Sequence, residues 1–314
     1  MRFAIQIEPQ YGFTFDDVTQ VVSLAEQYGY HALWTSDHLL WDTRSRRRSG
    51  LEAWTLLTAL APLTTHLRLG TLVTCVSFRH PSLLAKTVAS LDIISHGRVD
   101  CGLGAGWNAF ECQAYGIPFP PINTRMAQLR ETAHILKRLW TEEQVTWHGQ
   151  HYTLEAAPGM PKPLQPPLPL WIGGQGEHTL LRIVAEAADG WNMVAGKTVA
   201  EVQHKREVLW RHCEAVGRDP TTLDTSLFVL TYVYDTAQEF THCRADQERL
   251  LGPDSLANFD HARILGLAGS AAQVTETLRH YVALGFDYVI ALFPYQRERD
   301  LLQRYAAEVW PHLS

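Results

Sequence analysis

The sequence has few cysteines, no long apolar run and no large excess of charge of either sign. No uninterrupted apolar stretch approaches the roughly 20 residues that span a bilayer. Lys and Arg number 27 against 33 Asp and Glu, and the resulting net charge of -6 disfavours general binding to nucleic acid or to a membrane surface. The cysteines are scattered without a C-x-x-C pair, which argues against a disulfide framework or a zinc ribbon and favours a reducing, cytoplasmic compartment: Cys75, Cys101, Cys112, Cys213 and Cys243.

What the 314 residues do contain is apolar material for a large core, 46% of the chain. An α/β barrel of about 250 residues commonly forms one domain. Since no shift in composition marks a boundary, we expect a single domain over residues 1–314. The opening residues MRFAIQIEPQ lack the basic and hydrophobic regions of a signal peptide, so none is expected.

Short apolar segments alternate with helical patterns along almost the whole chain. The segments expected to form strands are 3–7, 32–36, 67–74, 98–104, 168–172, 191–194, 226–234 and 288–293. Helical periodicity follows each of them, at 15–29, 54–64, 82–95, 126–140, 178–188, 199–216, 237–272 with its continuation to 285, and 297–310. Eight strand–helix units predict parallel strands with right-handed crossovers, and their number favours a closed (β/α)8 TIM barrel over an open, doubly wound sheet.

One segment interrupts this alternation between the fourth and fifth strands. Residues 145–154 have the pattern of a β-hairpin that turns at Gly149 and Gln150. A proline-rich stretch follows up to Pro169. We therefore expect an insertion between strands four and five. His148 and His151 flank the turn without a third ligand, so no metal site is expected there.

Polar side chains at the strand ends are the candidates for chemistry, because active sites of such barrels lie at the carboxyl ends of the strands. The second strand leads into Asp37, His38 and Trp41, an acid/base pair beside an aromatic side chain. The alternative is a capping Asp next to an ordinary loop His. The same loop continues with four arginines, which suit either a solvated loop or an anionic arm of a ligand: Arg44, Arg46, Arg47 and Arg48.

Two glycine-rich segments also follow predicted strands. GGQG, residues 173–176, precedes a helix, where free N–H groups suit a phosphate; a tight turn that needs glycine for its backbone alone is the alternative. GLGAGWN, residues 102–108, imitates a dinucleotide fingerprint, but its spacing is G-x-G-x-G and no helix is expected directly after it. A Rossmann site is therefore disfavoured, and the glycines would instead let a flat ligand approach the backbone.

With these segments in place, the chain resembles the bacterial-luciferase-like superfamily of flavin-utilising monooxygenases, and within it the branch that uses coenzyme F420. The segment from Leu67 to Val99 is the most specific part of the resemblance. The matching motifs cover nearly the whole chain in order: IQIEPQYGF, LWTSDHLLW, LRLGTLVTCVSFRHPSLLAKTVASLDIISHGRV, GLGAGWN, AYGIPFPP, LWTEEQVTWHGQHYTL, PLPLWIGGQGE, AADGWN and YVALGFDYVI.

The resemblance implies a role for each matching position. His38 would donate or accept a proton over the cofactor ring, paired with Asp37, and Trp41 would form an aromatic wall beside the ring. The end of strand three would carry the family's cis non-proline peptide behind the ring. The cofactor contacts would come from that strand end and from the two glycine-rich segments: Leu72, Val73, Thr74, Gly104, Gly106, Trp107, Asn108, Gly173, Gly174, Gln175 and Gly176.

The function implied is hydride transfer between coenzyme F420 and an unidentified small organic substrate, without a metal. FMN-dependent monooxygenation with reduced flavin and dioxygen is the alternative within the superfamily. A metal-dependent hydrolase built on Asp37 and His38, and a flavin-binding protein without activity, are rivals outside it. The resemblance is also compatible with a homodimer formed through barrel-side helices.

One departure from the family bears on the substrate. The family's sugar-phosphate dehydrogenases carry a catalytic Glu after the strand-four glycines, where this chain has Trp107 and Asn108, with Glu111 further on. Lys197 stands where those enzymes have a phosphate-binding Lys. A lone Lys is weak evidence for a phosphate site, whereas the catalytic Glu is missing from its place. Sugar-phosphate oxidation is therefore disfavoured, and the substrate stays open.

Overall fold

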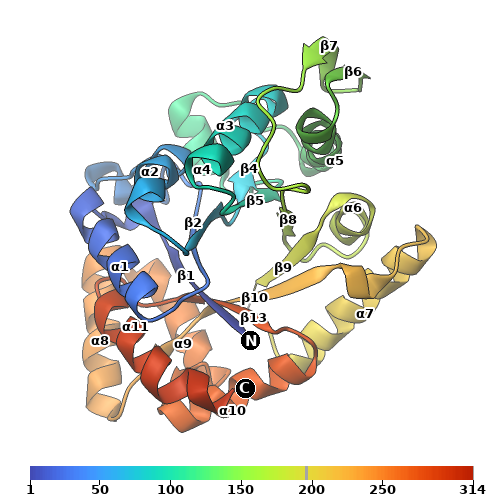
Figure 1. The fold of residues 1–314 in the computed structure, drawn as a ribbon. Coiled ribbons are helices and arrows are strands. Elements are labelled where there is room, and N and C mark those ends of the chain that lie inside the picture. Colours follow the sequence, from blue (N-terminus) through green and yellow to red (C-terminus); the bar gives the residue numbers. More distant parts are fainter. Residues whose placement is uncertain (195–196, 314) are drawn as a thin grey trace.

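Parallel strands form a closed barrel in the computed structural model, which describes residues 1–194 and 197–313 (Figure 1). Neighbouring strands pair in the order β3-β2-β1-β13-β10-β9-β8-β5, and a further pairing of β3 with β5 closes the ring. The strands are β1 (Arg2–Ile7), β2 (Ala32–Thr35), β3 (Arg68–Thr71), β5 (Val99–Gly104), β8 (Leu170–Gly173), β9 (Gly190–Val194), β10 (Asp224–Leu230) and β13 (Tyr288–Leu292). The predicted (β/α)8 barrel is thus confirmed.

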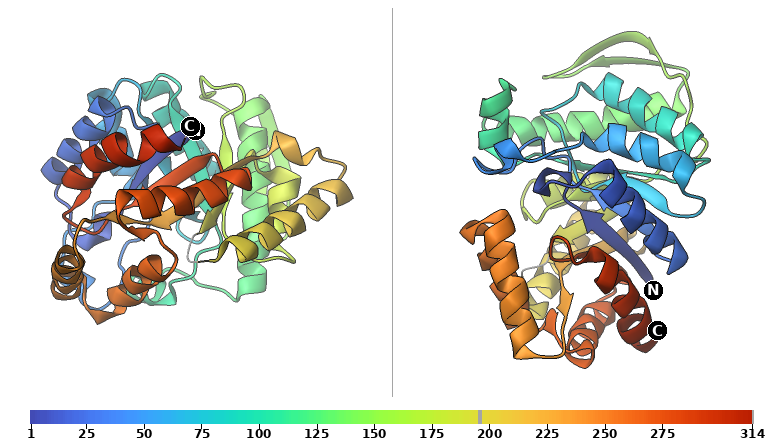
Figure 2. Two further views of the ribbon diagram at one scale, coloured as in Figure 1. Left: turned by 90° about the horizontal axis from the view of Figure 1, so that it is seen from below. Right: turned by 90° about the vertical axis from the view of Figure 1, so that its left-hand side faces the viewer.

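Helices surround this barrel on all sides, as the two further views show (Figure 2). Among the described residues, no helix is both long and apolar enough to cross a bilayer. The helices are α1 (Phe15–Gln27), α2 (Ala53–Leu60), α3 (Pro81–Ile94), α4 (Ala109–Tyr115), α5 (Ile122–Thr141), α6 (Leu180–Ala187), α7 (Val199–Ala215), α8 (Ala237–Leu251), α9 (Leu256–Ile264), α10 (Ala271–Ala283) and α11 (Glu298–Arg304).

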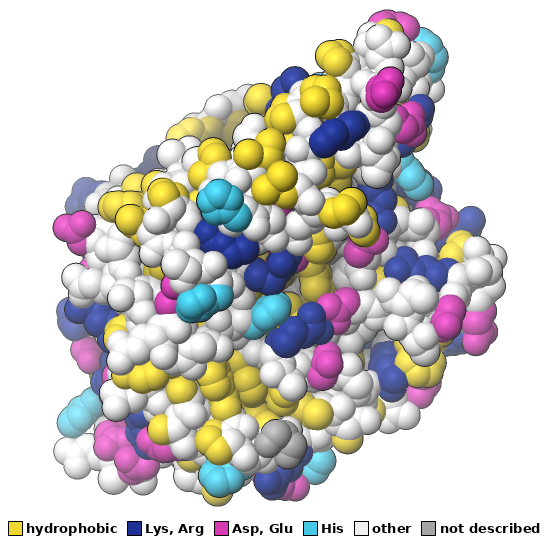
Figure 3. All heavy atoms as spheres, viewed as in Figure 1, with side chains coloured by type: hydrophobic (Ala, Val, Ile, Leu, Met, Phe, Trp, Pro, Cys, Tyr) yellow, Lys and Arg dark blue, Asp and Glu magenta, His cyan; other side chains and the backbone are white. Residues whose placement is uncertain are grey.

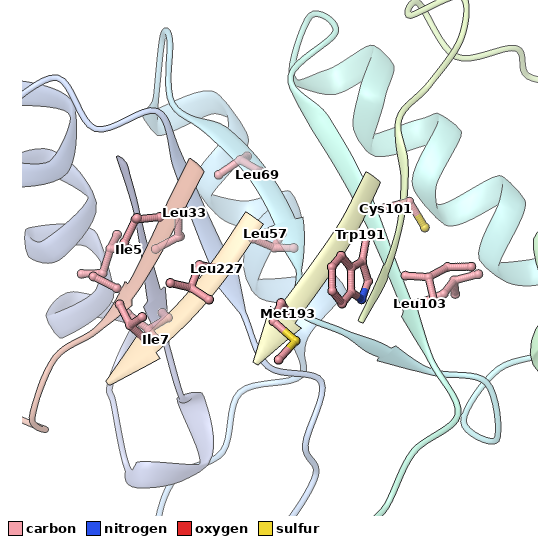
Figure 4. Close-up of a cluster of buried hydrophobic side chains, with 14 of the residues drawn as sticks. Ile5, Ile7, Leu33, Leu57, Leu69, Cys101, Leu103, Trp191, Met193 and Leu227 are labelled. Carbon is pink, nitrogen blue, oxygen red and sulfur yellow. The ribbon is translucent and has the colours of Figure 1, made fainter. Parts of the chain in front are cut away.

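The apolar side chains of each strand point alternately to the helices and to the barrel axis. Ile5, Leu33 and Leu227 face outward and belong to the large core between strands and helices (Figure 4). Trp34 and Trp171 fill the inside, with their ring centroids 6.0 Å apart. This packed interior gives the strand ends a rigid base.

Ion pairs occupy the end of the barrel where the strands begin. Arg2 forms two hydrogen bonds of 2.7 and 2.6 Å to the Asp224 carboxylate. Arg68 binds Asp100 in the same two-pronged way, at 2.7 and 2.9 Å. The cavity described below lies at the other end, where the strands finish.

The insertion between the fourth and fifth barrel strands is confirmed as a hairpin of β6 (Gln144–His148) and β7 (Thr153–Pro158). It projects from the upper right of the molecule (Figure 3). The Glu131 carboxylate of α5 accepts the indole N–H of Trp147 at 3.2 Å and three backbone N–H groups of the turn. This carboxylate fixes the turn against α5.

Three local expectations were wrong or incomplete. A helix, α4, does begin directly after GLGAGWN, because Asn108 caps it by accepting the N–H of Phe110 at 3.2 Å. The region 237–272 holds two helices, α8 and α9. The strand expected over 67–74 stops at Thr71 and resumes as β4 (Thr74–Cys75), and the peptide bond between Leu72 and Val73 is cis. The cis non-proline peptide implied by the resemblance is thus present.

Candidate active site

A cavity of about 500 Å³ opens where the barrel strands end. Loops after β1, β2, β3, β5 and β8 contribute to its wall, together with residues from α5 and α9. The structure brings together in this wall most of the residues predicted from the sequence: Asp37, His38, Trp41, Leu72, Val73, Gly104, Gly106, Trp107, Gly173, Gly174, Gln175 and Gly176.

Thr74 and Asn108, also predicted to contact a cofactor, lie behind the wall. The Thr74 hydroxyl bonds Thr71 at 2.8 Å and accepts the indole N–H of Trp54 at 3.0 Å. The Asn108 side chain caps α4 and donates to the Leu40 carbonyl at 3.0 Å. Both residues therefore support the loops that carry the site.

His38 is held by Glu111 from the first turn of α4. The distance from His38 Nδ1 to Glu111 Oε1 is 2.7 Å, and the side chains are 17% and 3% exposed. The other carboxylate oxygen of Glu111 accepts the backbone N–H groups of Leu39 at 2.8 Å and Leu40 at 3.2 Å. Because Nδ1 faces Glu111, Nε2 is the ring nitrogen left for the cavity.

Burial alone would lower the pKa of His38, but the hydrogen bond and the charge of Glu111, with smaller contributions from Glu8 and Asp37, raise that pKa above its ordinary value. The protonated imidazolium is thus favoured relative to a histidine in water. The site holds a group that can give or take a proton near neutral pH.

Asp37, expected to pair with His38, is engaged by Arg79 instead. Its oxygens lie 2.6 and 2.9 Å from the Arg79 guanidinium, and its side chain is buried. Arg79 also bonds Glu52, whose side chain caps α2. Asp37 therefore anchors the loop after β2 to the segment that leads into α3.

Three rings meet at the rim of the cavity. The centroids of His38 and Trp41 are 5.1 Å apart, those of His38 and Trp107 are 5.3 Å apart, and those of the two indoles are 5.2 Å apart. All three contacts are edge-on, an arrangement that aromatic rings favour. Trp107 is nevertheless 63% exposed, which leaves much of an indole surface open at the rim.

The floor of the cavity is made by Val73. A Cβ atom on Gly173 would lie 2.8 Å from Val73 Cγ1, and a Cβ atom on Gly104 would collide with Val73 Cγ2. The glycines at the ends of β5 and β8 therefore make room for the Val73 side chain. The sequence had suggested room for a ligand at these positions; in the structure, part of that space is filled by Val73.

The GGQG loop joins β8 to α6 and has free backbone donors. Gly174 adopts a φ of 135°, where a side chain is disfavoured, and its N–H donates to the Asn192 carbonyl at 3.1 Å. The N–H groups of Gln175 and Gly176 have no acceptor among the described residues. Glu177 turns away to Lys205, at 2.5 Å, so the free donors face no carboxylate of their own loop.

Glu8, at the end of β1, is a buried carboxylate of the wall that the predicted set did not include. Gln6 donates to one of its oxygens at 2.7 Å and Gln10 to the other at 2.5 Å. Ser36 in turn donates to Gln10 at 2.9 Å. The buried Oε1 of Gln6 has no hydrogen-bond partner among the described residues.

The arginine loop after β2 lies beside the cavity, and its members differ in their contacts. Arg48 donates to the Leu250 carbonyl at 2.6 Å, and Arg46 lies over the Phe110 ring at 5.2 Å. Arg46 and Arg47 are exposed, whereas Arg48 is half-buried. Arg48 therefore holds the loop against the segment that contains Leu250, whereas Arg46 and Arg47 are accessible to a ligand.

Comparison with known proteins gives a family match and relatives over most of the chain. The family model described as luciferase-like monooxygenase matches residues 1–247. An uncharacterized protein of Mycobacterium tuberculosis is 34% identical over 185 residues, which cover 59% of this chain and 63% of that protein, less than two thirds of either. An F420-dependent glucose-6-phosphate dehydrogenase of Amycolatopsis mediterranei is 32% identical over 321 residues, covering 95% of this chain and 94% of the relative. The crystal structure of monooxygenase RslO1 from Streptomyces bottropensis superposes with a TM-score of 0.83 over 100% of both chains, at 23% identity, a likeness in fold.

Proposed function

The chain belongs to the luciferase-like monooxygenase family, and on that premise we propose that it is an oxidoreductase that transfers a hydride between coenzyme F420 and an organic substrate. The observation that carries the proposal is the pair of His38 and Glu111, 2.7 Å apart, with the second ring nitrogen of His38 left for the cavity. F420 is preferred over a flavin because the relative that aligns along 95% of this chain is named as F420-dependent.

The residues around the cavity fit a flat ring with a phosphate-bearing tail. Val73 offers an apolar floor for the ring, and Trp41 an aromatic wall. The free amides of Gln175 and Gly176, just before α6, suit a phosphate. When bound, a deazaflavin ring accepts or returns a hydride, which is two electrons and one proton.

His38 would supply the accompanying proton transfer. In the oxidation of an alcohol, the neutral imidazole takes the hydroxyl proton at Nε2 while the carbon loses its hydride. In the reverse direction, the imidazolium gives that proton to the carbonyl oxygen. Glu111 holds the ring in place for both directions and stabilises its positive charge.

Replacing the imidazole tests this role. His38→Ala should keep the fold and cofactor binding and lower turnover by about 10²–10⁴-fold, the usual contribution of general acid/base catalysis. Equal turnover of variant and wild type at saturating cofactor would remove His38 from the mechanism.

The choice between F420 and FMN depends on the tail beyond the phosphate. F420 continues into lactate and glutamates, and these carboxylates would meet the exposed Arg46 and Arg47 at the same end of the barrel. Exposed ion pairs contribute about 0.2–1 kcal/mol each, so removing both should weaken F420 binding roughly 2- to 30-fold. FMN lacks these carboxylates and should be unaffected.

Parallel titrations with F420 and FMN at low and high salt decide the cofactor. The proteins are wild type, Arg46→Ala/Arg47→Ala, and the control Arg182→Ala/Arg211→Ala, which removes the same charge from exposed positions of α6 and α7. We expect tighter binding of F420, weakened by salt and by the first double substitution. Tighter binding of FMN would replace the proposal by FMN-dependent monooxygenation with reduced flavin and dioxygen.

A further inference from the structure

Resting on the proposed function, we infer that the substrate of this site is an uncharged molecule with an apolar body and one hydroxyl or carbonyl group. The inference comes from which side chains line the cavity and how their charges are already satisfied. Neither the fold nor the cofactor determines which substrate the site binds, so the substrate has to be inferred from these side chains.

Apart from His38, whose imidazolium is paired with Glu111, the described residues that line the cavity offer no cation to an anionic substrate. None of the described residues that line it is Lys or Arg, and three are carboxylates: Glu8, Asp37 and Glu111. Asp37 is neutralised by Arg79 and Glu111 by His38, whereas Glu8 receives only the amide groups of two glutamines. A substrate phosphate or carboxylate placed beside Glu8, across the barrel from the GGQG loop after β8, would be desolvated opposite like charge, which is strongly unfavourable.

The two lysines near the GGQG loop are paired with carboxylates. Lys197, after β9, lines a neighbouring cleft against α7 that shares only Gln175 and Gly176 with the cavity, and its Nζ lies 3.7 Å from Glu201. Lys205 in the same cleft binds Glu177 at 2.5 Å. The relative from Amycolatopsis mediterranei is named for glucose 6-phosphate, a substrate that carries a phosphate. Among the described residues that line the cavity of this chain, no Lys or Arg is present to bind such a group.

The rest of the wall suits an apolar body. Trp41 and Trp107 present indoles 5.2 Å apart at the rim, and the exposed face of Trp107 is a large apolar surface in contact with water. Ile122 and Met126 of α5 and Phe228 of β10 continue the apolar lining. A substrate that covers the Trp107 indole would remove this surface from water.

His38 in the cavity wall can hydrogen-bond the hydroxyl or carbonyl group. Its Nε2 can accept the hydrogen bond of an alcohol or donate one to a carbonyl oxygen. Oxidation then sends the carbon-bound hydrogen with two electrons to the cofactor and the hydroxyl proton to His38, and the carbonyl product remains uncharged. The site therefore fits both partners of an alcohol–carbonyl pair.

A matched pair of ligands tests the charge preference directly. The probes are 4-methylcyclohexanol and 4-hydroxycyclohexanecarboxylate, which share the ring and the hydroxyl, with glucose 6-phosphate as a third ligand. Binding is measured by calorimetry on the wild-type protein, with and without F420. We expect 4-methylcyclohexanol to bind at least about 100-fold more tightly than either anion.

Two variants test the parts of the wall. Trp107→Ala should weaken the neutral ligand about tenfold, whereas the control Trp210→Ala, on α7 and stacked on Arg206, should leave it unchanged. Trp107→Lys should shrink the preference over the carboxylate by supplying the missing cation.

Each outcome bears on one of the two proposals. Equal or tighter binding of an anion by the wild type, or no binding of 4-methylcyclohexanol by a protein that binds F420, would overturn the inference. Binding of the neutral ring without any binding of F420 would overturn the proposed function and still support this assignment of the substrate.

Discussion

Replacing Glu111 by glutamine keeps the size of the side chain and should reverse the hydrogen bonding of His38. One carboxylate oxygen of Glu111 accepts the N–H groups of Leu39 and Leu40, at 2.8 and 3.2 Å, so in Glu111→Gln the amide oxygen must stay on that side. The amide NH₂ group then faces His38 Nδ1, which must accept. The proton of the neutral imidazole is forced onto Nε2, and the base in the cavity is lost.

The size of the effect separates this tautomer argument from a purely electrostatic one. A charge-assisted hydrogen bond is worth about 1.5–3 kcal/mol, so loss of charge alone would slow the reaction roughly 10- to 150-fold. Loss of the general base should slow alcohol oxidation by about 10²–10⁴-fold.

The pH profile should change as well. In the wild type, oxidation needs the neutral imidazole and should rise with pH through the raised pKa of His38. In the variant that pKa falls, because the carboxylate that raised it is gone.

Nitrogen NMR of the histidine ring and steady-state kinetics measure the two effects separately. We expect the spectrum of Glu111→Gln to show His38 protonated at Nε2, with unchanged cofactor affinity and thermal stability close to that of the wild type. Glu214→Gln removes a charge from the exposed surface of α7 and serves as the control. A spectrum with the proton still on Nδ1, together with a rate within tenfold of wild type, would refute the reasoning.

Three further substitutions test the packing around the site. Gly104→Ala should displace Val73, weaken cofactor binding and cost about 1–3 kcal/mol of stability, and Val73→Ala in the same chain should restore part of both; denaturation and titration of the double mutant decide this. Asp100→Asn should leave the half-buried Arg68 without its charged partner and lower stability by about 3–5 kcal/mol at unchanged cofactor affinity, measured by urea unfolding. Burial would raise the pKa of Glu26, but hydrogen bonds from three backbone amides before β3 hold it at about 2, so the stabilising effect is present above the ordinary pKa and is lost as pH falls toward 2. Glu26→Gln should accordingly destabilise the protein by about 1–2 kcal/mol at pH 7 and by less in acid, as seen in unfolding curves at several pH values.

The sequence was sufficient to predict the barrel and the end of the barrel that carries the site. Buried strands and periodic helices are local patterns, and residues such as His38, Trp41 and Gln175 lie in loops that follow strands, so their position at one end of the barrel could be predicted. Thr74 and Asn108 were predicted on the same ground, but a step of one or two residues along the chain turns a side chain to another face.

The partners of these residues could not be predicted in the same way. Glu111 belongs to α4, a helix of 7 residues, too short to show a periodic pattern. Arg79, which binds Asp37, is 42 residues away in sequence, and nothing local marks the two as neighbours. Adjacency in the chain favoured the wrong pair, Asp37 with His38, because pairing across a barrel is decided by tertiary packing.

The Val73 side chain packs against glycines at the ends of β5 and β8. This contact limits which substitutions the protein can accept during evolution. Any larger residue at Gly104 or Gly173 meets Val73 first, and a larger residue at Val73 meets those glycines. A larger residue at any of these three positions, introduced alone, should therefore be disfavoured, whereas a smaller residue at position 73 makes room at the other two. Among relatives, a residue larger than glycine at position 104 or 173 should occur together with a smaller residue at position 73, and a lineage that reshapes the floor of the cavity should acquire the change at position 73 first.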